Sequence, residues 1–203
     1  MFRIILALTL ILLGSGGLSG CSAGVSPTEP ETFDLLGNQV QFQPPPKDWK
    51  PDFQEDPPDL GQPKGQVVGL VFKQPDGKGR ITVTNLDVSD ALVDEKTGDV
   101  PKPGATGKYQ PLDQNKPLLN RLVEPVSRRD GKVLKQDYRT VGGENAYWFE
   151  FEFGEGGTRQ KGKQVHFTKD KHLYSVTLTV SESVYASSLP VFDRIVETFK
   201  VLK

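Results

Sequence analysis

The sequence predicts an α+β fold, in which an antiparallel β-sheet is covered by packed helices. Three observations lead to this prediction. Several segments alternate apolar and polar residues, as half-buried strands do. Two short segments repeat apolar residues at helical spacing, and the second lies close to the C-terminus. Finally, 21 glycines and 16 prolines favour a strand-rich chain with many turns over a helical one.

The first 20 residues have the pattern of a secretory signal peptide. Arg3 is the only charge, the unbroken apolar segment Ile4 to Leu13 follows it, and small residues come next. The apolar run is too short to span a bilayer, which takes roughly 20 residues. Residues 1–20 are therefore expected to be cleaved.

Cys21 is the only cysteine, and it ends the sequence Leu18-Ser19-Gly20-Cys21. This sequence resembles the lipobox of bacterial lipoproteins, in which cleavage leaves the cysteine as the new N-terminus. The resemblance implies that Cys21 is the lipidation site, carrying acyl chains such as palmitate on its sulfur and its amine. More than one acyl chain gives lasting membrane attachment. The alternative is an ordinary secreted protein with one free thiol.

Residues 21–32 are expected to form a flexible tether, because Ser22 to Glu31 is small, polar and proline-bearing. The folded domain is expected over residues 33–203. We expect the protein on the extracytoplasmic side of the cell envelope. Ser22, rather than aspartate, follows the cysteine, which favours the outer membrane in a Gram-negative host. In a cyanobacterium the thylakoid or plasma membrane is expected.

Charge excludes some classes of partner. Cleavage removes only the charge of Arg3, so the formal net charge changes from −1 to about −2. Nucleic acid as a partner would require a basic face, which this balance does not favour. The same balance argues against a polybasic clamp on the membrane surface.

The N-terminal half of the domain predicts strands separated by proline-rich segments. Gln39 to Phe42 alternates as a strand does, and Pro44 to Trp49 cannot continue it. Residues 51–63 hold four prolines and four acids and are expected to be a loop. Two further strands form a hairpin across a turn at Pro75 to Gly79. They are expected at residues 66–72 and 80–88.

The middle of the chain predicts a loop and then a helix. Residues 94–111 hold three glycines and three prolines and are expected to be a mobile loop. Pro117 to Val123 has apolar residues on one helical face. Pro125 is expected to limit this helix to roughly two turns or to kink it.

The C-terminal part predicts three strands and a helix. After a strand at 132–140, residues 146–153 alternate, with Tyr147, Phe149, Phe151 and Phe153 on one face and Trp148, Glu150 and Glu152 on the other. Residues 163–168 and 173–180 read as a hairpin. The last helix opens near Ser187, Ser188 and Pro190 and has an apolar stripe of Phe192, Ile195, Val196 and Phe199. We expect this stripe to pack on the four-aromatic face.

The C-terminal run resembles that of PsbP-like proteins, which are extrinsic proteins of photosystem II and their bacterial relatives. It has a strand after Gly142-Gly143, the hairpin KGKQVHFTKDKHLYSVTLTV, and a proline-containing helix that closes on Phe199-Lys200-Val201. The Pro45 to Trp49 segment is a second shared feature. The resemblance spans residues 33–203 and implies an α-β-α sandwich. Loops 51–63 and 98–111 depart from the family, and fold alone does not fix function.

The two histidines do not predict a metal site. If the hairpin turns at Asp170-Lys171, His166 shares a face with Ser175, whereas His172 lies on the opposite face. One ion could not take both without a distorted turn. A weak surface site at His166 with a nearby acid is the alternative, because PsbP-like proteins have been linked to metal ions. We predict no metal-binding and no cofactor-binding residues.

The sequence predicts no catalytic residues. Lipidation leaves no free cysteine, Gly-x-Ser-x-Gly is absent, and neither histidine lies in a recognisable triad context. Glu150 and Glu152 are interpreted as part of a solvated strand face rather than as an acid–base pair. The chain is therefore expected not to be an enzyme.

The resulting prediction is a non-catalytic, membrane-anchored envelope lipoprotein that binds or scaffolds a membrane-protein partner. The alternative is a lipoprotein that binds a small ligand or a divalent metal in a cleft near the proline-rich loops.

Overall fold

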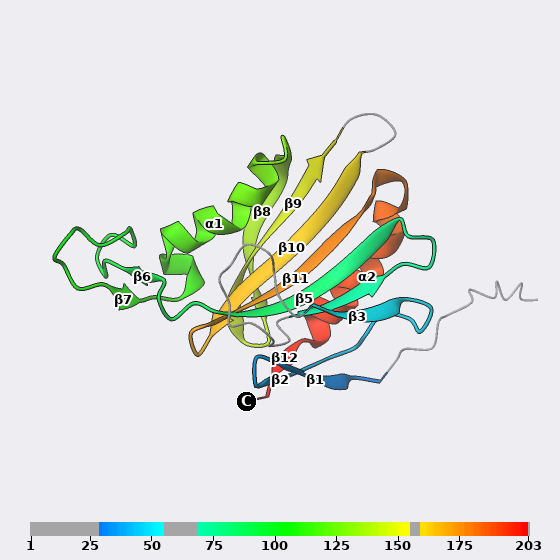
Figure 1. Cartoon of the computed structure of the whole chain (residues 1–203), viewed down its shortest axis with the longest axis horizontal. Helices are drawn as coiled ribbons and strands as arrows, with labels where there is room; N and C mark the ends of the chain where they lie inside the picture. Colours follow the sequence, from blue (N-terminus) through cyan, green and yellow to red (C-terminus); the bar gives the residue numbers. More distant parts are fainter. Residues whose placement is uncertain (1–28, 55–68, 155–158, 203) are drawn as a thin grey trace, which may run out of the picture.

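The computed structural model describes residues 29–54, 69–154 and 159–202. The predicted signal peptide, Cys21 and most of the predicted tether lie outside these residues. The centre of the fold is a seven-stranded antiparallel sheet in the order β3-β4-β5-β11-β10-β9-β8 (Figure 1). Its strands are β3 (Lys50–Gln54), β4 (Gly69–Lys73), β5 (Gly79–Asp87), β8 (Lys132–Val141), β9 (Glu144–Phe153), β10 (Gln160–Lys169) and β11 (His172–Ser181).

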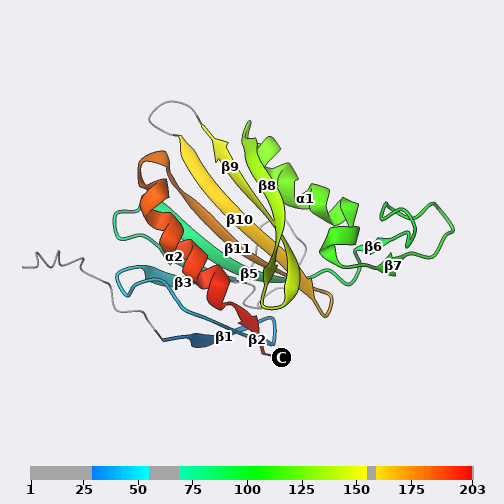
Figure 2. The same ribbon diagram turned by 180° about the vertical axis from the view of Figure 1, so that it is seen from behind.

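One long helix covers each face of this sheet. Helix α1 (Lys116–Ser127) lies on one face, and α2 (Tyr185–Thr198) lies on the other, as the front and back views show (Figures 1 and 2). The predicted α+β fold and the α-β-α sandwich are confirmed. Among the described residues, neither helix has the length and apolar character needed to cross a membrane.

Smaller elements complete the domain. Strand β12 (Lys200–Val201) follows α2 and adds to the hairpin of β1 (Glu31–Leu35) and β2 (Asn38–Phe42). Strands β6 (Leu92–Val93) and β7 (Lys108–Tyr109) pair with each other. Two short 3₁₀ helices, η1 (Leu112–Gln114) and η3 (Glu182–Val184), precede α1 and α2. The first strand begins two residues before the expected start of the domain at residue 33.

Both predicted hairpins form. Strands β4 and β5 pair across the expected turn, and β10 and β11 pair across Asp170 and Lys171. These two turn residues have φ angles of 49° and 64°, the left-handed backbone of a type I′ hairpin turn. The turn fixes the register that places His166 opposite Ser175.

The core has two halves, one on each face of the sheet. The prediction that the α2 stripe packs on the aromatic face of β9 is wrong. Tyr147, Phe149 and Phe151 of β9 are buried as predicted and Phe153 is half-buried, but these rings pack under α1 with Leu118 and Val126. The stripe of α2 packs instead on the other face. Its Phe199 ring lies 5.7 Å from that of Phe42 and 5.4 Å from that of Phe167. Alternation predicts which residues share a face, but it does not say which helix covers that face.

Helix α1 is longer than predicted. It begins at the side chain of Asn115, which accepts a hydrogen bond from the Leu118 amide at 3.1 Å, and it continues through Pro125 to Ser127. A proline at this position removes the hydrogen bond that the Arg121 carbonyl would accept. Pro125 is exposed and sits in the last turn, where the loss of one hydrogen bond does not end the helix.

Two expected loops contain strand structure. Pro51 to Gln54 forms most of β3, an edge strand, where a proline needs no partner for its missing N–H. Residues 55–63 of that predicted loop lie outside the described residues. In the segment 94–111, β7 pairs with β6, and the Asp94 carboxylate accepts hydrogen bonds from the Lys96 and Thr97 amides at 2.9 and 3.1 Å.

Candidate functional site

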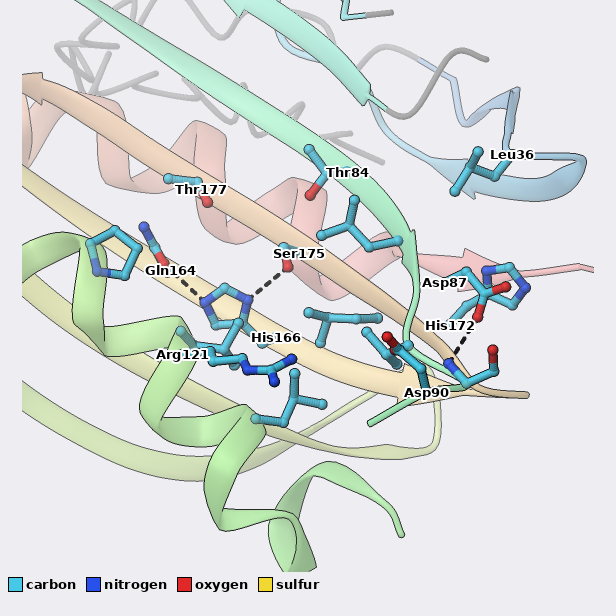
Figure 3. A pocket seen from close by; sticks show the side chains of 17 residues that line it. Leu36, Thr84, Asp87, Asp90, Arg121, Gln164, His166, His172, Ser175 and Thr177 are labelled. Carbon is cyan, nitrogen blue, oxygen red and sulfur yellow. Dashed lines mark hydrogen bonds between the residues drawn. The ribbon is translucent and has the colours of Figure 1, made fainter. Parts of the chain in front are cut away.

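A cleft of about 600 Å³ lies between α1 and the central sheet (Figure 3). Helix α1 packs over β8 and β9 and leaves the same face of β5, β10 and β11 partly uncovered. The positions of these strands that alternate away from α2 therefore form the floor of the cleft. This floor is polar and consists of Thr84, Gln164, His166, Ser175 and Thr177.

The walls of the cleft differ from its floor. Helix α1 contributes the apolar residues Leu118, Leu122 and Pro125, together with Arg121. The end of β5 and the segment after it close the far end with Leu86 and Val88 and with the carboxylates of Asp87 and Asp90. The cleft thus combines apolar walls with a few polar groups, which is the usual make-up of a small-molecule site.

His166 lies at the centre of the floor and is 4 % exposed. Its Nδ1 is 2.7 Å from Ser175 Oγ, and its Nε2 is 2.9 Å from Gln164 Oε1 (Figure 3). Burial lowers the pKa of His166 from 6.5 to about 3, so the ring is neutral at physiological pH. Because an amide oxygen only accepts, Nε2 carries the proton, and the Ser175 hydroxyl donates to Nδ1.

These contacts bring together a serine and a histidine that the sequence reasoning did not join as a nucleophile–base pair. The sequence feature that could have identified this pair is the strand face that His166 and Ser175 share, and the β10–β11 register confirms that the two residues lie opposite each other. The pair is poorly suited to catalysis by a triad mechanism. A histidine with a pKa of about 3 is a weak base, and the third group, Gln164, is a neutral amide that cannot stabilise an imidazolium as a carboxylate does.

His172 lies on the opposite face of the hairpin, as predicted. Its Nδ1 is 3.0 Å from Asn85 Oδ1, and Asn85 Nδ2 donates to the Leu35 carbonyl at 2.8 Å. This network ties the β1–β2 hairpin to the central sheet. Within the described ranges, no three histidine, aspartate or glutamate side chains gather as ligands for one metal ion.

Glu150, Glu152 and Trp148, which were also singled out from the sequence, lie on the α2 face of the sheet, away from the cleft. Glu150 pairs across strands with Lys163 and Lys135, and Glu152 pairs with Lys161 and Lys132. Both acids are half-buried on the α2 face. Trp148 packs against the α2 core, and Lys163 Nζ lies 5.3 Å from its ring centre.

No protein-family model and no curated protein matches this sequence. The solution structure of cyanobacterial PsbP (CyanoP) from Synechocystis is similar, with a TM-score of 0.50 and 14% identity, covering 92% of this chain and 99% of that one.

Two other solved structures are more distant. A Pseudomonas aeruginosa protein of unknown function, described as a putative regulator, has a TM-score of 0.43 and 13% identity over 83% of this chain and 94% of its own. LpqN of Mycobacterium tuberculosis, which is involved in cell envelope biogenesis, has a TM-score of 0.35 and 11% identity over 83% of this chain and 97% of its own. At these identities a likeness concerns the fold alone. The chain has a PsbP-like fold.

Proposed function

We propose that this chain is a non-catalytic, lipid-anchored protein of the bacterial cell envelope that acts by binding. The lipobox-like sequence ending at Cys21 supports the anchor and the extracytoplasmic location. The PsbP-like fold is compatible with this role but does not specify it. The neutral, weakly basic His166 argues against hydrolysis by the serine that it contacts.

The cleft beside α1 is the observation that carries the binding function. Its volume of about 600 Å³ lies within the range of small-molecule sites, roughly 300–1,000 Å³. Its floor is held rigidly, because His166 fixes Ser175 and Gln164 through two hydrogen bonds at the bottom of a continuous sheet. This favours the small-ligand form of the function that the sequence left as the alternative.

A second candidate function is contact with a membrane-protein or other envelope partner. Two exposed apolar side chains support it: Leu92 of β6 is 44% exposed, and Val100 in the segment between β6 and β7 is 69% exposed. Loops that carry exposed apolar groups are frequent recognition elements.

Photo-crosslinking in the producing cell tests both small-ligand binding in the cleft and contact with an envelope partner. A p-benzoylphenylalanine is placed at Leu122 in the cleft, at Val100 in the loop, or at the exposed Glu197 of α2 as a control. We expect a small adduct of reproducible mass at position 122 and none at position 197. A protein adduct specific to position 100 would support the partner. Equal yields at positions 122 and 197 would contradict the cleft as a binding site.

A further inference from the structure

The cleft contains a cation that no neighbouring acid neutralises within the described part of the chain. Arg121 extends from α1 into the space in front of His166 (Figure 3). The nearest acid along the helix, Glu124, pairs with Arg128 at 2.9 Å. Among the described residues, Arg121 forms no ion pair within 4.0 Å. A guanidinium presents several N–H donors in a planar fork, which suits an oxyanion.

The floor near Arg121 adds neutral hydrogen-bond donors. The amide oxygen of Gln164 faces His166, so its NH₂ group is what the side chain can offer to a ligand (Figure 3). Thr84 and Thr177 line the same floor with hydroxyl groups. His166 is neutral and therefore adds no charge of either sign to this part of the cleft.

The charge of the cleft is polarised along its length. Asp87 lies at the far end beside His172, and Asp90 lies between Asp87 and Arg121, as Figure 3 shows. The Asp87 carboxylate accepts a hydrogen bond from the Ser89 amide at 2.8 Å, and this bond lowers its pKa. The acids therefore disfavour an anion at their own end. An anion would lie at the Arg121 end, with one cation to neutralise one negative charge.

The apolar walls of the cleft favour a ligand in which an apolar group is attached to that anion. Leu118, Leu122 and Pro125 follow one another along the cleft side of α1, and Leu86, Val88 and Leu173 continue the apolar surface. Because apolar groups gain free energy when they leave water, a ligand that reaches from Arg121 along these side chains binds through both ends.

We propose that the cleft binds a small organic monoanion, a carboxylate on an apolar chain, with its charge at Arg121 and its chain along α1. This inference rests on the proposed binding function and names the class of ligand.

Calorimetric and NMR titration with octanoate tests the proposal. The protein is the chain from residue 21 onward with Cys21→Ser, which carries no acyl groups and needs no detergent. We expect octanoate to shift amide resonances of α1, β10 and β11, and octanol and octylammonium to bind more weakly. Shortening the acid from octanoate to hexanoate should weaken binding by about fourfold for each methylene.

A matched pair of variants isolates the charge. Arg121→Gln should weaken octanoate binding by at least about tenfold, whereas Arg128→Gln, at the C-cap of the same helix and outside the cleft, should leave it unchanged. Octanol binding as tightly as octanoate, or equal effects of the two variants, would overturn the proposal. If octanoate fails to bind but the adduct at position 122 persists, the ligand class is wrong and the binding function stands. If both fail, the cleft is not a binding site.

Discussion

At the residue scale, His166 shows how a polar side chain can be buried at low cost. Both ring nitrogens have partners, and the ring lies 5.7 Å from that of Phe149 in a stacked arrangement. A buried polar group with satisfied hydrogen bonds avoids the penalty of an unpaired one. The charged form has no such compensation, which is why burial lowers the pKa of His166 to about 3.

The pKa of His166 predicts a pH dependence of stability. Between pH 3 and 6.5 the unfolded chain binds a proton at this residue and the folded chain does not. The free energy of unfolding should therefore be highest above pH 6.5. It should fall as the pH drops from 6.5 towards 3, by up to about 1.4 kcal/mol for each pH unit. The measurement is urea unfolding at several pH values, with His166→Gln as the reference that removes the contribution. Parallel pH curves for the two proteins would contradict the buried neutral state.

Gly162 is a second residue whose identity the packing requires. It lies in β10 opposite Phe151, and a Cβ at this position would overlap the Phe151 ring and the Leu178 carbonyl oxygen. Gly162→Ala should lower the free energy of unfolding by about 1–3 kcal/mol. Thermal or urea unfolding measures the loss. Adding Phe151→Leu should recover part of it, and a second substitution that only adds to the loss would argue against this overlap.

At the element scale, each helix stabilises its own face of the sheet. Phe151 and Val126 belong to the cluster under α1, whereas Ile195 belongs to the cluster under α2. Phe151→Ala should cost about 3–5 kcal/mol. In double-mutant cycles its coupling to Val126→Ala should exceed about 0.5 kcal/mol, and its effect should add to that of Ile195→Val within about that value. The reverse pattern would place α2 on the aromatic face.

The sequence specified elements better than their contacts. Alternation in β9 predicted the burial of Tyr147, Phe149 and Phe151, and the two-residue turn at Asp170 and Lys171 predicted the hairpin register. Which helix covers which face depends on long-range strand order, and no local pattern encodes that order. The cleft was missed for the same reason, since it forms where α1 stops short of β10 and β11. In the sequence, the polar residues of its floor cannot be told apart from those of an ordinary solvated strand face.

At the scale of the whole molecule, we propose that a membrane anchor at Cys21 is joined to a rigid binding domain. The described domain begins at the hairpin of β1, and the predicted lipidation site precedes it by several residues. Cys21→Ser should therefore abolish acyl labelling and release the protein from the membrane fraction or leave it uncleaved. Metabolic labelling with palmitate followed by fractionation measures this. Unchanged labelling of the variant would refute lipidation at Cys21.

If the cleft beside α1 holds a ligand, a large side chain that fills the cleft should displace it. Thr177→Trp places a large side chain on the cleft floor, whereas Thr179→Trp on the same strand lies outside the cleft and serves as the control. The measurement is native mass spectrometry of the full lipidated chain purified from its own membranes. We predict additional bound mass on the wild type and on Thr179→Trp, and its loss from Thr177→Trp with folding intact. Equal bound mass on all three proteins, or none on the wild type, would contradict ligand binding in the cleft.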